Sequence, residues 1–178
     1  MKINVEKCAG LLKDRDNILI LCHAHPDGDT LGCGYALLRA LQKQGKTVRL
    51  ECADEIPKKY SYLYDDITVS DFNEEYVIAV DVATENLLGS LEEKYAGRVD
   101  LCIDHHGTNT DYAKYLLLNA DAAAACEVVL KVIKAMGVEI DKKMADCLYT
   151  GITTDSGCFR YSSVTSVSYT HLTLPTKR

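Results

Sequence analysis

Short apolar runs alternate with stretches of helical spacing along most of the chain. The apolar runs at 17–22, 47–52, 77–81 and 98–104 predict buried strands. Between Leu31 and Gln44 apolar residues recur at helical spacing, and Gly45 follows as a stop signal, so this segment predicts a helix.

Capping residues mark further helices. Pro57 begins a short predicted helix in IPKKYSYL, and Glu85 to Tyr95 predicts a helix broken at Gly89. Asp121 is the expected N-cap of a helix that runs to Met136 and stops at Gly137, and Asp141 is the expected N-cap of another that runs from Lys142 towards Thr150.

Strands separated by helical segments are typical of βαβ units. The pattern therefore predicts an α/β fold with a mainly parallel sheet and helices on both faces. In open parallel sheets the ligand lies beyond the carboxyl ends of the strands. We expect the functional residues at that edge of the sheet.

Composition and charge narrow the class of protein. The 178 residues are 47% hydrophobic and 26% charged, which is ordinary for one soluble domain. The apolar runs are shorter than the roughly 20 residues that span a bilayer, and the first residues are charged, so we expect a cytoplasmic protein without membrane partners. The eight scattered cysteines include no CxxC pair and are expected to be reduced. The net charge of −6 disfavours a long duplex as ligand and leaves a small anionic substrate open.

Histidines and aspartates gather after the predicted strands. His23, Asp27 and Asp29 follow the first strand, Asp81 ends the third, and Asp104-His105-His106 end the fourth. Each group alone has a structural explanation, because aspartates cap helices and adjacent histidines occur in surface loops. Four of the five histidines lie in two of these loops, however, and Asp155 lies in a fourth polar segment, GITTDSGCFRY. Imidazole and carboxylate ligands together suit Mn²⁺, Fe²⁺, Co²⁺ or Zn²⁺, and so many candidates favour two ions bridged by a shared carboxylate.

The segments HAHPDGDTLG, VIAVDVAT, CIDHHG and GITTDSGCFRY, in this order, resemble the four motifs of the DHH phosphoesterase superfamily. Within it they are most similar to the bifunctional oligoribonuclease and phosphoadenosine-phosphate phosphatase group. The resemblance covers residues 1–166 and implies the N-terminal DHH phosphoesterase domain. It also implies a C-terminal substrate-binding domain, called DHHA1, which we expect to be missing from this sequence. Residues 167–178 resemble a translated sequencing adapter and are expected to be a non-native tail.

The resemblance also implies roles for single residues. One metal ion is expected on His23, Asp27 and Asp81, and the other on Asp29, Asp81 and His105, with Asp155 completing the centre. His106 would contact the substrate phosphate, and Asp104 would fix a neighbouring histidine. His25 stands where relatives often carry Asn and is a candidate ligand or phosphate contact. Arg160 is a candidate substrate contact, although a structural ion pair is the simpler interpretation.

The activity implied is hydrolysis of short RNA oligonucleotides to mononucleotides by a water activated between two divalent ions, preferably Mn²⁺. It extends to the 3′-phosphate of phosphoadenosine phosphate. The expected partners are short single-stranded RNA or nucleotide phosphoesters, and a homodimer of the full-length protein is left open. A family II inorganic pyrophosphatase, a cyclic dinucleotide phosphodiesterase and a catalytically inactive metal-binding fragment remain as alternatives.

Overall fold

The computed structural model describes residues 1–158 and residue 160. Its centre is a five-stranded, wholly parallel sheet with the strand order β2-β1-β3-β4-β5. The strands are β1 (Ile18–Leu21), β2 (Val48–Glu51), β3 (Tyr76–Val80), β4 (Leu101–Asp104) and β5 (Tyr115–Leu118). The parallel sheet confirms the predicted α/β class.

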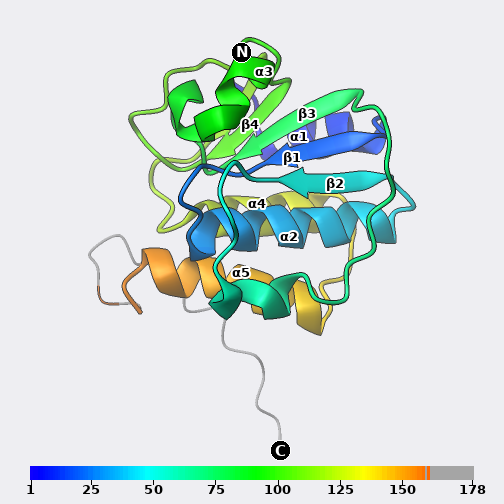
Figure 1. The fold of residues 1–178 in the computed structure, drawn as a ribbon, viewed down its shortest axis with the longest axis vertical. Coiled ribbons are helices and arrows are strands. Elements are labelled where there is room, and N and C mark those ends of the chain that lie inside the picture. Colours follow the sequence, from blue (N-terminus) through cyan, green and yellow to red (C-terminus); the bar gives the residue numbers. More distant parts are fainter. Residues whose placement is uncertain (159, 161–178) are drawn as a thin grey trace, which may run out of the picture.

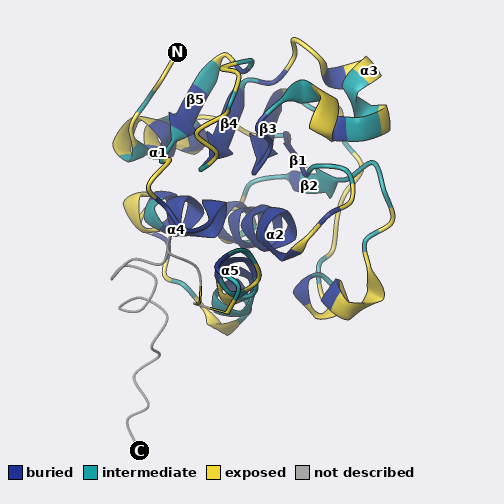
Figure 2. Ribbon diagram, turned by 90° about the vertical axis from the view of Figure 1, so that its left-hand side faces the viewer, coloured by how far each residue is buried: buried dark blue, intermediate teal, exposed yellow. Residues whose placement is uncertain are grey.

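Helices cover the sheet unequally. The α-helices are α1 (Val5–Lys13), α2 (Gly28–Lys43), α3 (Glu92–Tyr95), α4 (Ala125–Ala135) and α5 (Lys142–Asp155), and two 3₁₀ helices are η1 (Lys58–Leu63) and η2 (Glu85–Leu91). In Figure 2 the sheet lies above α4 and α2, and α5 forms a further layer below α2. Figure 1 shows α3 on the opposite side of the sheet.

Two apolar clusters fill the space on the two faces of the sheet. Ile18, Ile20 and Ile78 point to the side of α1, α2 and α4, where the larger cluster continues into α5. Leu19, Leu21 and Val77 point to the other side and pack with Leu88 and Tyr95 of η2 and α3. Side chains alternate between the faces of a strand, so strands buried on both sides read as continuous apolar runs, as the sequence suggested.

The sequence did not predict two of the elements. One is α1, which Asn4 caps by accepting a hydrogen bond from the Lys7 amide. The other is β5, which follows β4 after a connection that contains no helix. Tyr112 and Ala113 of this connection pack in the cluster on the second face of the sheet. In the described part of the chain no helix is long and apolar enough to cross a membrane.

Two predicted helix starts were wrong. The helix predicted from Leu31 begins at Gly28, because the Asp27 side chain accepts hydrogen bonds from the amides of Asp29 and Thr30. The helix predicted after Asp121 begins at Ala125, and its N-cap Ala124 has no side chain that could accept. The carboxylate of a distant residue, Asp29, takes that place instead. Asp141 caps α5 as predicted, and α5 continues beyond Thr150 to Asp155.

Candidate metal centre

The polar loops converge where β1, β3 and β4 end. These three strands are neighbours in the sheet, and β1 and β3 flank the point at which the strand order reverses. Such a switch point opens a crevice at the carboxyl edge of a parallel sheet. The loop after β1, the end of β3 and the end of β4 therefore place their side chains beside the start of α2 and the end of α5.

His23, Asp27 and Asp81 form the first group of potential ligands. The His23 Nε2 atom lies 3.6 Å from Asp27 Oδ1 and 3.7 Å from Asp81 Oδ2. His23 Nδ1 lies 2.7 Å from the Ala24 carbonyl oxygen, which accepts its proton and leaves Nε2 with a free lone pair in the neutral ring. Burial lowers the pKa of His23, but the carboxylates of Asp27 and Asp81 outweigh it and raise the pKa to about 10 in the metal-free protein.

Asp29, His105 and Asp155 form the second group. His105 Nε2 lies 3.4 Å from Asp155 Oδ2 and 3.9 Å from Asp29 Oδ2. His105 Nδ1 lies 3.2 Å from the Ala122 carbonyl oxygen, so this ring also directs Nε2 into the cluster. Burial, followed by the charge of Asp29, raises the pKa of the Asp155 carboxyl group.

Asp81 connects the two groups. Its Oδ2 faces His23, and its Oδ1 lies 3.6 Å from His105 Nε2. The residue is 4% exposed and has a φ of 59°, a left-handed conformation that aspartate tolerates better than most residues. Burial and the nearby Asp29 carboxylate raise the pKa of Asp81 well above its usual value. A carboxylate held in this way is unfavourable unless a cation compensates it.

Two buried atoms indicate that this donor set fits divalent cations. Asp81 Oδ1 and His105 Nε2 have no hydrogen-bond partner in the described part of the chain. Their separation of 3.6 Å is too long for a hydrogen bond. Ligand atoms about 2.1 Å from one ion lie about 3 to 3.5 Å apart, close to the separations found here. The mixture of imidazole nitrogen and carboxylate oxygen suits Mn²⁺, Fe²⁺, Co²⁺ or Zn²⁺.

Asp29 also holds the start of α4. Its Oδ2 accepts a hydrogen bond of 2.7 Å from the Ala125 amide, and its Oδ1 one of 3.0 Å from the Cys126 amide. The Cys33 thiol lies 3.6 Å from Oδ1. The carboxylate is 1% exposed and faces the positive end of the helix dipole. Because a carboxylate has about four lone-pair sites, these bonds leave capacity for a cation.

Asp104 fixes the second histidine of the Asp-His-His run. Its Oδ1 lies 2.8 Å from His106 Nδ1, and its Oδ2 accepts a 2.7 Å hydrogen bond from Asn109 Nδ2. Burial raises the pKa of Asp104, but the hydrogen bonds from His106 and Asn109 outweigh it and hold the pKa below its usual value. The His106 side chain is 43% exposed, so its outer nitrogen can meet a substrate. The bond to Asp104 raises the pKa of His106 to about 9.

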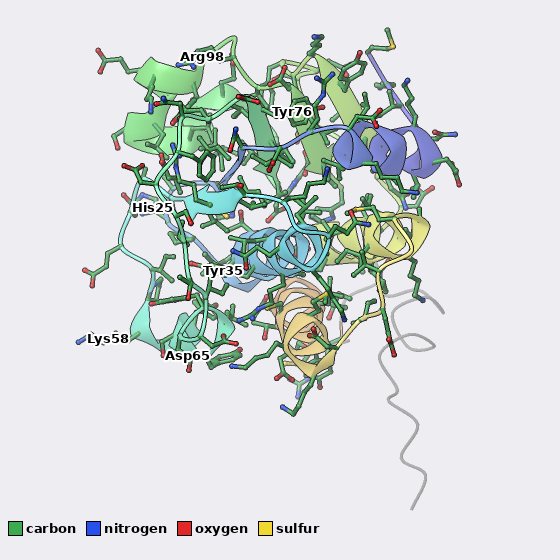
Figure 3. All side chains as sticks on the ribbon, turned by 90° about the vertical axis from the view of Figure 1, so that its right-hand side faces the viewer. His25, Tyr35, Lys58, Asp65, Tyr76 and Arg98 are labelled. Atoms are coloured by element: carbon green, nitrogen blue, oxygen red, sulfur yellow. The ribbon has the colours of Figure 1, made fainter. Side chains whose placement is uncertain are left out.

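The other two candidate residues lie outside these ligand groups. His25 has a φ of 55°, its side chain is 94% exposed, and its Nδ1 lies 2.8 Å from Asp54 Oδ2 (Figure 3). Arg160 is exposed in the turn after α5, where its amide donates to the Ser156 carbonyl oxygen. The suspected non-native tail, residues 167–178, lies outside the described residues.

Sequence reasoning missed residues that orient the candidate ligands. Asn109 lies in the loop after β4 and donates to both Asp104 and the Val82 carbonyl oxygen. Thr30 donates to the Val80 carbonyl oxygen and accepts from the His23 amide, so it ties the loop after β1 to β3. Thr30 lies inside the HAHPDGDTLG motif, but nothing in the sequence shows that its hydroxyl ties two loops together. A polar residue shortly after Asp-His-His-Gly is the sole hint at Asn109.

Comparison with known proteins identifies the family. Residues 17–152 match the model of the DHH family, N-terminal domain. The bifunctional oligoribonuclease and PAP phosphatase NrnA of Thermus thermophilus is 32% identical over 154 residues, which are 83% of this chain and 46% of the relative. The chain thus spans about half the length of the curated relatives it matches.

Two solved structures resemble the fold. The crystal structure of an exopolyphosphatase-related protein from Bacteroides fragilis superimposes with a TM-score of 0.83 at 24% identity, over 93% of this chain and 53% of that one. The RecJ structure from Thermus thermophilus, determined in complex with Mn²⁺, gives a TM-score of 0.53 at 18% identity, over 82% of this chain and 23% of that one. With the family model matching most of its length, the chain belongs to the DHH family.

Proposed function

We propose that this chain carries the metal centre of a phosphoesterase that hydrolyses short RNA oligonucleotides to mononucleotides. The proposal includes the 3′-phosphate of phosphoadenosine phosphate as a second substrate, and two divalent ions, preferably Mn²⁺, as cofactors. The relative named as a bifunctional oligoribonuclease and PAP phosphatase supports the substrate class. The choice of manganese is supported by the imidazole and carboxylate ligands and by the RecJ structure described in complex with Mn²⁺.

Each residue of the cluster then has an assigned place. His23, Asp27 and Asp81 would hold one ion, and Asp29, Asp81, His105 and Asp155 the other, with Asp81 shared. A pair of divalent ions supplies an activated water and neutralises charge on a phosphoryl group. The carbonyl oxygens of Ala24 and Ala122 keep the two imidazoles turned towards the ions.

His106 is the proposed substrate contact. Asp104 holds its Nδ1 and so fixes the ring, while the exposed part of the ring faces outwards. A fixed imidazole can donate a hydrogen bond to a phosphate oxygen and orient it relative to the ligand cluster. Asn109 supports this role indirectly, because it holds Asp104 from the other side.

The proposal rests above all on the facing pair of Asp81 Oδ1 and His105 Nε2. Both atoms are buried and lack hydrogen-bond partners in the described part of the chain, and they belong to two different strand ends. Leaving buried polar atoms unsatisfied costs about 1–3 kcal/mol each, so a fold that retains a facing pair is explained by a cation bound between them.

The direct test measures metal content and hydrolysis together. Titration with Mn²⁺ in a calorimeter is expected to give two ions per chain, and Asp81→Ala is expected to abolish both binding steps. Hydrolysis is then followed by chromatography with RNA dinucleotides to pentanucleotides, phosphoadenosine phosphate, pyrophosphate and a cyclic dinucleotide. Release of mononucleotides from RNA supports the proposal. Cleavage of pyrophosphate or the cyclic dinucleotide alone would favour those alternatives.

The whole protein's activity is part of the same proposal, because the chain covers 46% of its Thermus thermophilus relative. Two bound ions without hydrolysis of any phosphoester would support the metal-binding fragment as the better description. No bound ion at millimolar Mn²⁺ would rule out the metal centre itself. The cytoplasmic location, the absence of long duplex among the ligands and the homodimer of the full-length protein stay predictions.

A further inference from the structure

Packed against α2 and α5, η1 carries an exposed aromatic ring in a fixed position. Tyr62 is 43% exposed, although its hydroxyl lies 2.7 Å from Thr150 Oγ1 on α5. Thr150 Oγ1 donates its own proton to the Asp146 carbonyl oxygen, so the Tyr62 hydroxyl is the donor in the contact between the two side chains. The ring is thereby anchored at one end while much of it remains open to solvent.

Two lysines precede Tyr62 in the same short helix, and the Nζ atom of one of them, Lys59, lies 4.8 Å from the centroid of the Tyr60 ring. Lys58 and Lys59 are exposed, and neither forms an ion pair within the described residues. Figure 3 shows Lys58 extending from η1 away from the body of the molecule. The aspartates that follow η1 are already engaged, since Asp65 pairs with Lys143 and Asp66 with Arg39. In a chain with a net charge of −6, two cations without a carboxylate partner favour an anionic ligand.

α5 connects this surface to the metal centre. Thr150 and Thr154 lie one helical turn apart, and Asp155 follows directly. Thr154 packs against Gly28, where an added Cβ would lie 2.4 Å from its Oγ1, next to the ligand Asp27. The step from Thr150 to Asp155 is about 7.5 Å along the helix at about 1.5 Å per residue. Stacked nucleotides of one strand rise about 3.4 Å each, so about two to three nucleotides span this step.

We infer that Tyr62, Lys58 and Lys59 form a binding surface for single-stranded RNA, on which Tyr62 stacks a nucleobase and the lysines contact a phosphate. The inference rests on the proposed function and adds a nucleobase contact to the phosphate contact proposed for His106. A nucleobase has an apolar face that stacks on a fixed aromatic ring whatever its sequence, and single-strand binding proteins combine such rings with cations. A phosphomonoester on a single nucleoside is too short to reach from the metal centre to this ring.

The test separates stacking from a purely structural tether. Affinity for a fluorescent RNA pentanucleotide with phosphorothioate linkages is measured by anisotropy for the wild type, Tyr62→Leu and Tyr62→Phe. Stacking is worth about 1–3 kcal/mol per base, so Tyr62→Leu is expected to weaken binding about 5- to 150-fold. Tyr62→Phe keeps the ring and is expected to bind within about threefold of the wild type. Thermal unfolding of both variants shows whether the tether to Thr150 matters for the fold.

The lysines are tested by salt dependence. Each phosphate contact on a single strand contributes about 0.7 to the slope of log affinity against log salt concentration. Lys58→Ala with Lys59→Ala is expected to reduce that slope by about 0.7, for the one phosphate that the two lysines contact. Lys7→Ala with Lys13→Ala removes the same charge from exposed positions on α1 and is expected to leave the slope unchanged.

Several results would overturn the inference. These are equal RNA affinity in Tyr62→Leu and the wild type, equal losses in Tyr62→Leu and Tyr62→Phe, and no RNA binding by the wild type. A changed oligomeric state of Tyr62→Leu with unchanged RNA affinity would assign the ring to a protein contact instead. Failure of the proposed function is seen separately, as loss of Mn²⁺ binding or of phosphoester hydrolysis in the wild type.

Discussion

The substitution Asp81→Asn separates metal binding from folding. Asparagine has nearly the same shape and tolerates the left-handed backbone that Asp81 adopts at a φ of 59°. It removes the negative charge and replaces one of the oxygens that face His23 and His105 with an NH₂ group that cannot ligate. We expect the metal-free variant to be about as stable as the wild type, because the loss of the contact with His23 is offset by relief of the burial of the Asp81 carboxylate and of its repulsion by Asp29.

The size of the effect follows from mass action. An ion present at 100 times its Kd stabilises the folded protein by about 2.7 kcal/mol. For a domain of this size about 1 kcal/mol moves the Tm by about 2–4 °C, so one occupied site is worth about 5–11 °C. Two sites that share Asp81 give up to about twice that shift. We expect Asp81→Asn to lose nearly all of it.

The assay compares thermal unfolding, followed by circular dichroism, with EDTA and with saturating Mn²⁺. Asp111→Asn is the matched control, because Asp111 also has a positive φ, 57°, but its side chain is 52% exposed and contacts Lys2. The control should keep the full Mn²⁺-dependent shift. An equal shift in Asp81→Asn and the wild type would refute the shared ligand, and a large loss of Tm in EDTA would refute the argument from the buried charge.

Two further predictions test the packing around the centre, and a third tests the role of His106. Gly151→Ala places a Cβ 2.2 Å from the Cys126 sulfur and should destabilise the protein by about 1–3 kcal/mol in urea unfolding, whereas Gly10→Ala, with nothing within 4 Å, should be neutral or stabilising. Equal stabilities of these two variants would contradict the close approach of α5. Asp29→Ala leaves two α4 amides unsatisfied and should cost about 1–3 kcal/mol even in EDTA, and no change there would show that Asp29 does not hold α4. His106→Gln should lower kcat at least about tenfold with two Mn²⁺ ions still bound, and a loss of metal in calorimetry would instead make His106 a ligand.

The sequence predicted the strands best where they are buried on both faces. β1 and β3 read as unbroken apolar runs, and these runs also located the carboxyl edge at which the polar residues meet. β5 was not predicted, because it is an edge strand and follows β4 through a loop, without the helix that usually announces a parallel partner. α1 was missed since its charged first turns were interpreted only as evidence against a signal peptide.

The candidate ligands could be predicted because chemistry limits which residue types bind metal ions, and the motifs supplied their order. The groups that orient these candidate ligands could not be predicted. The carbonyl oxygens of Ala24 and Ala122 fix the two histidines, and every residue has a carbonyl, so no side-chain pattern marks these two. His25 has the right residue type in the right loop, yet its left-handed backbone turns the ring to Asp54. Tertiary contacts, here those with Asp54, decide the backbone conformation of His25 and therefore where its ring points.

Asp29 shows why a structural and a functional interpretation of one residue need not compete. From sequence, an aspartate at this position is either a helix cap or a metal ligand, but the structure places its carboxylate between the amides of α4 and the Nε2 atom of His105. The helix amides stabilise the negative charge that a cation requires, and they hold it in one orientation before any ion binds. The same bonds couple the centre to the core, because α4 packs on α2 and α1. A substitution at Asp29 should therefore change both stability and metal binding, whereas one at Asp81 should change metal binding alone.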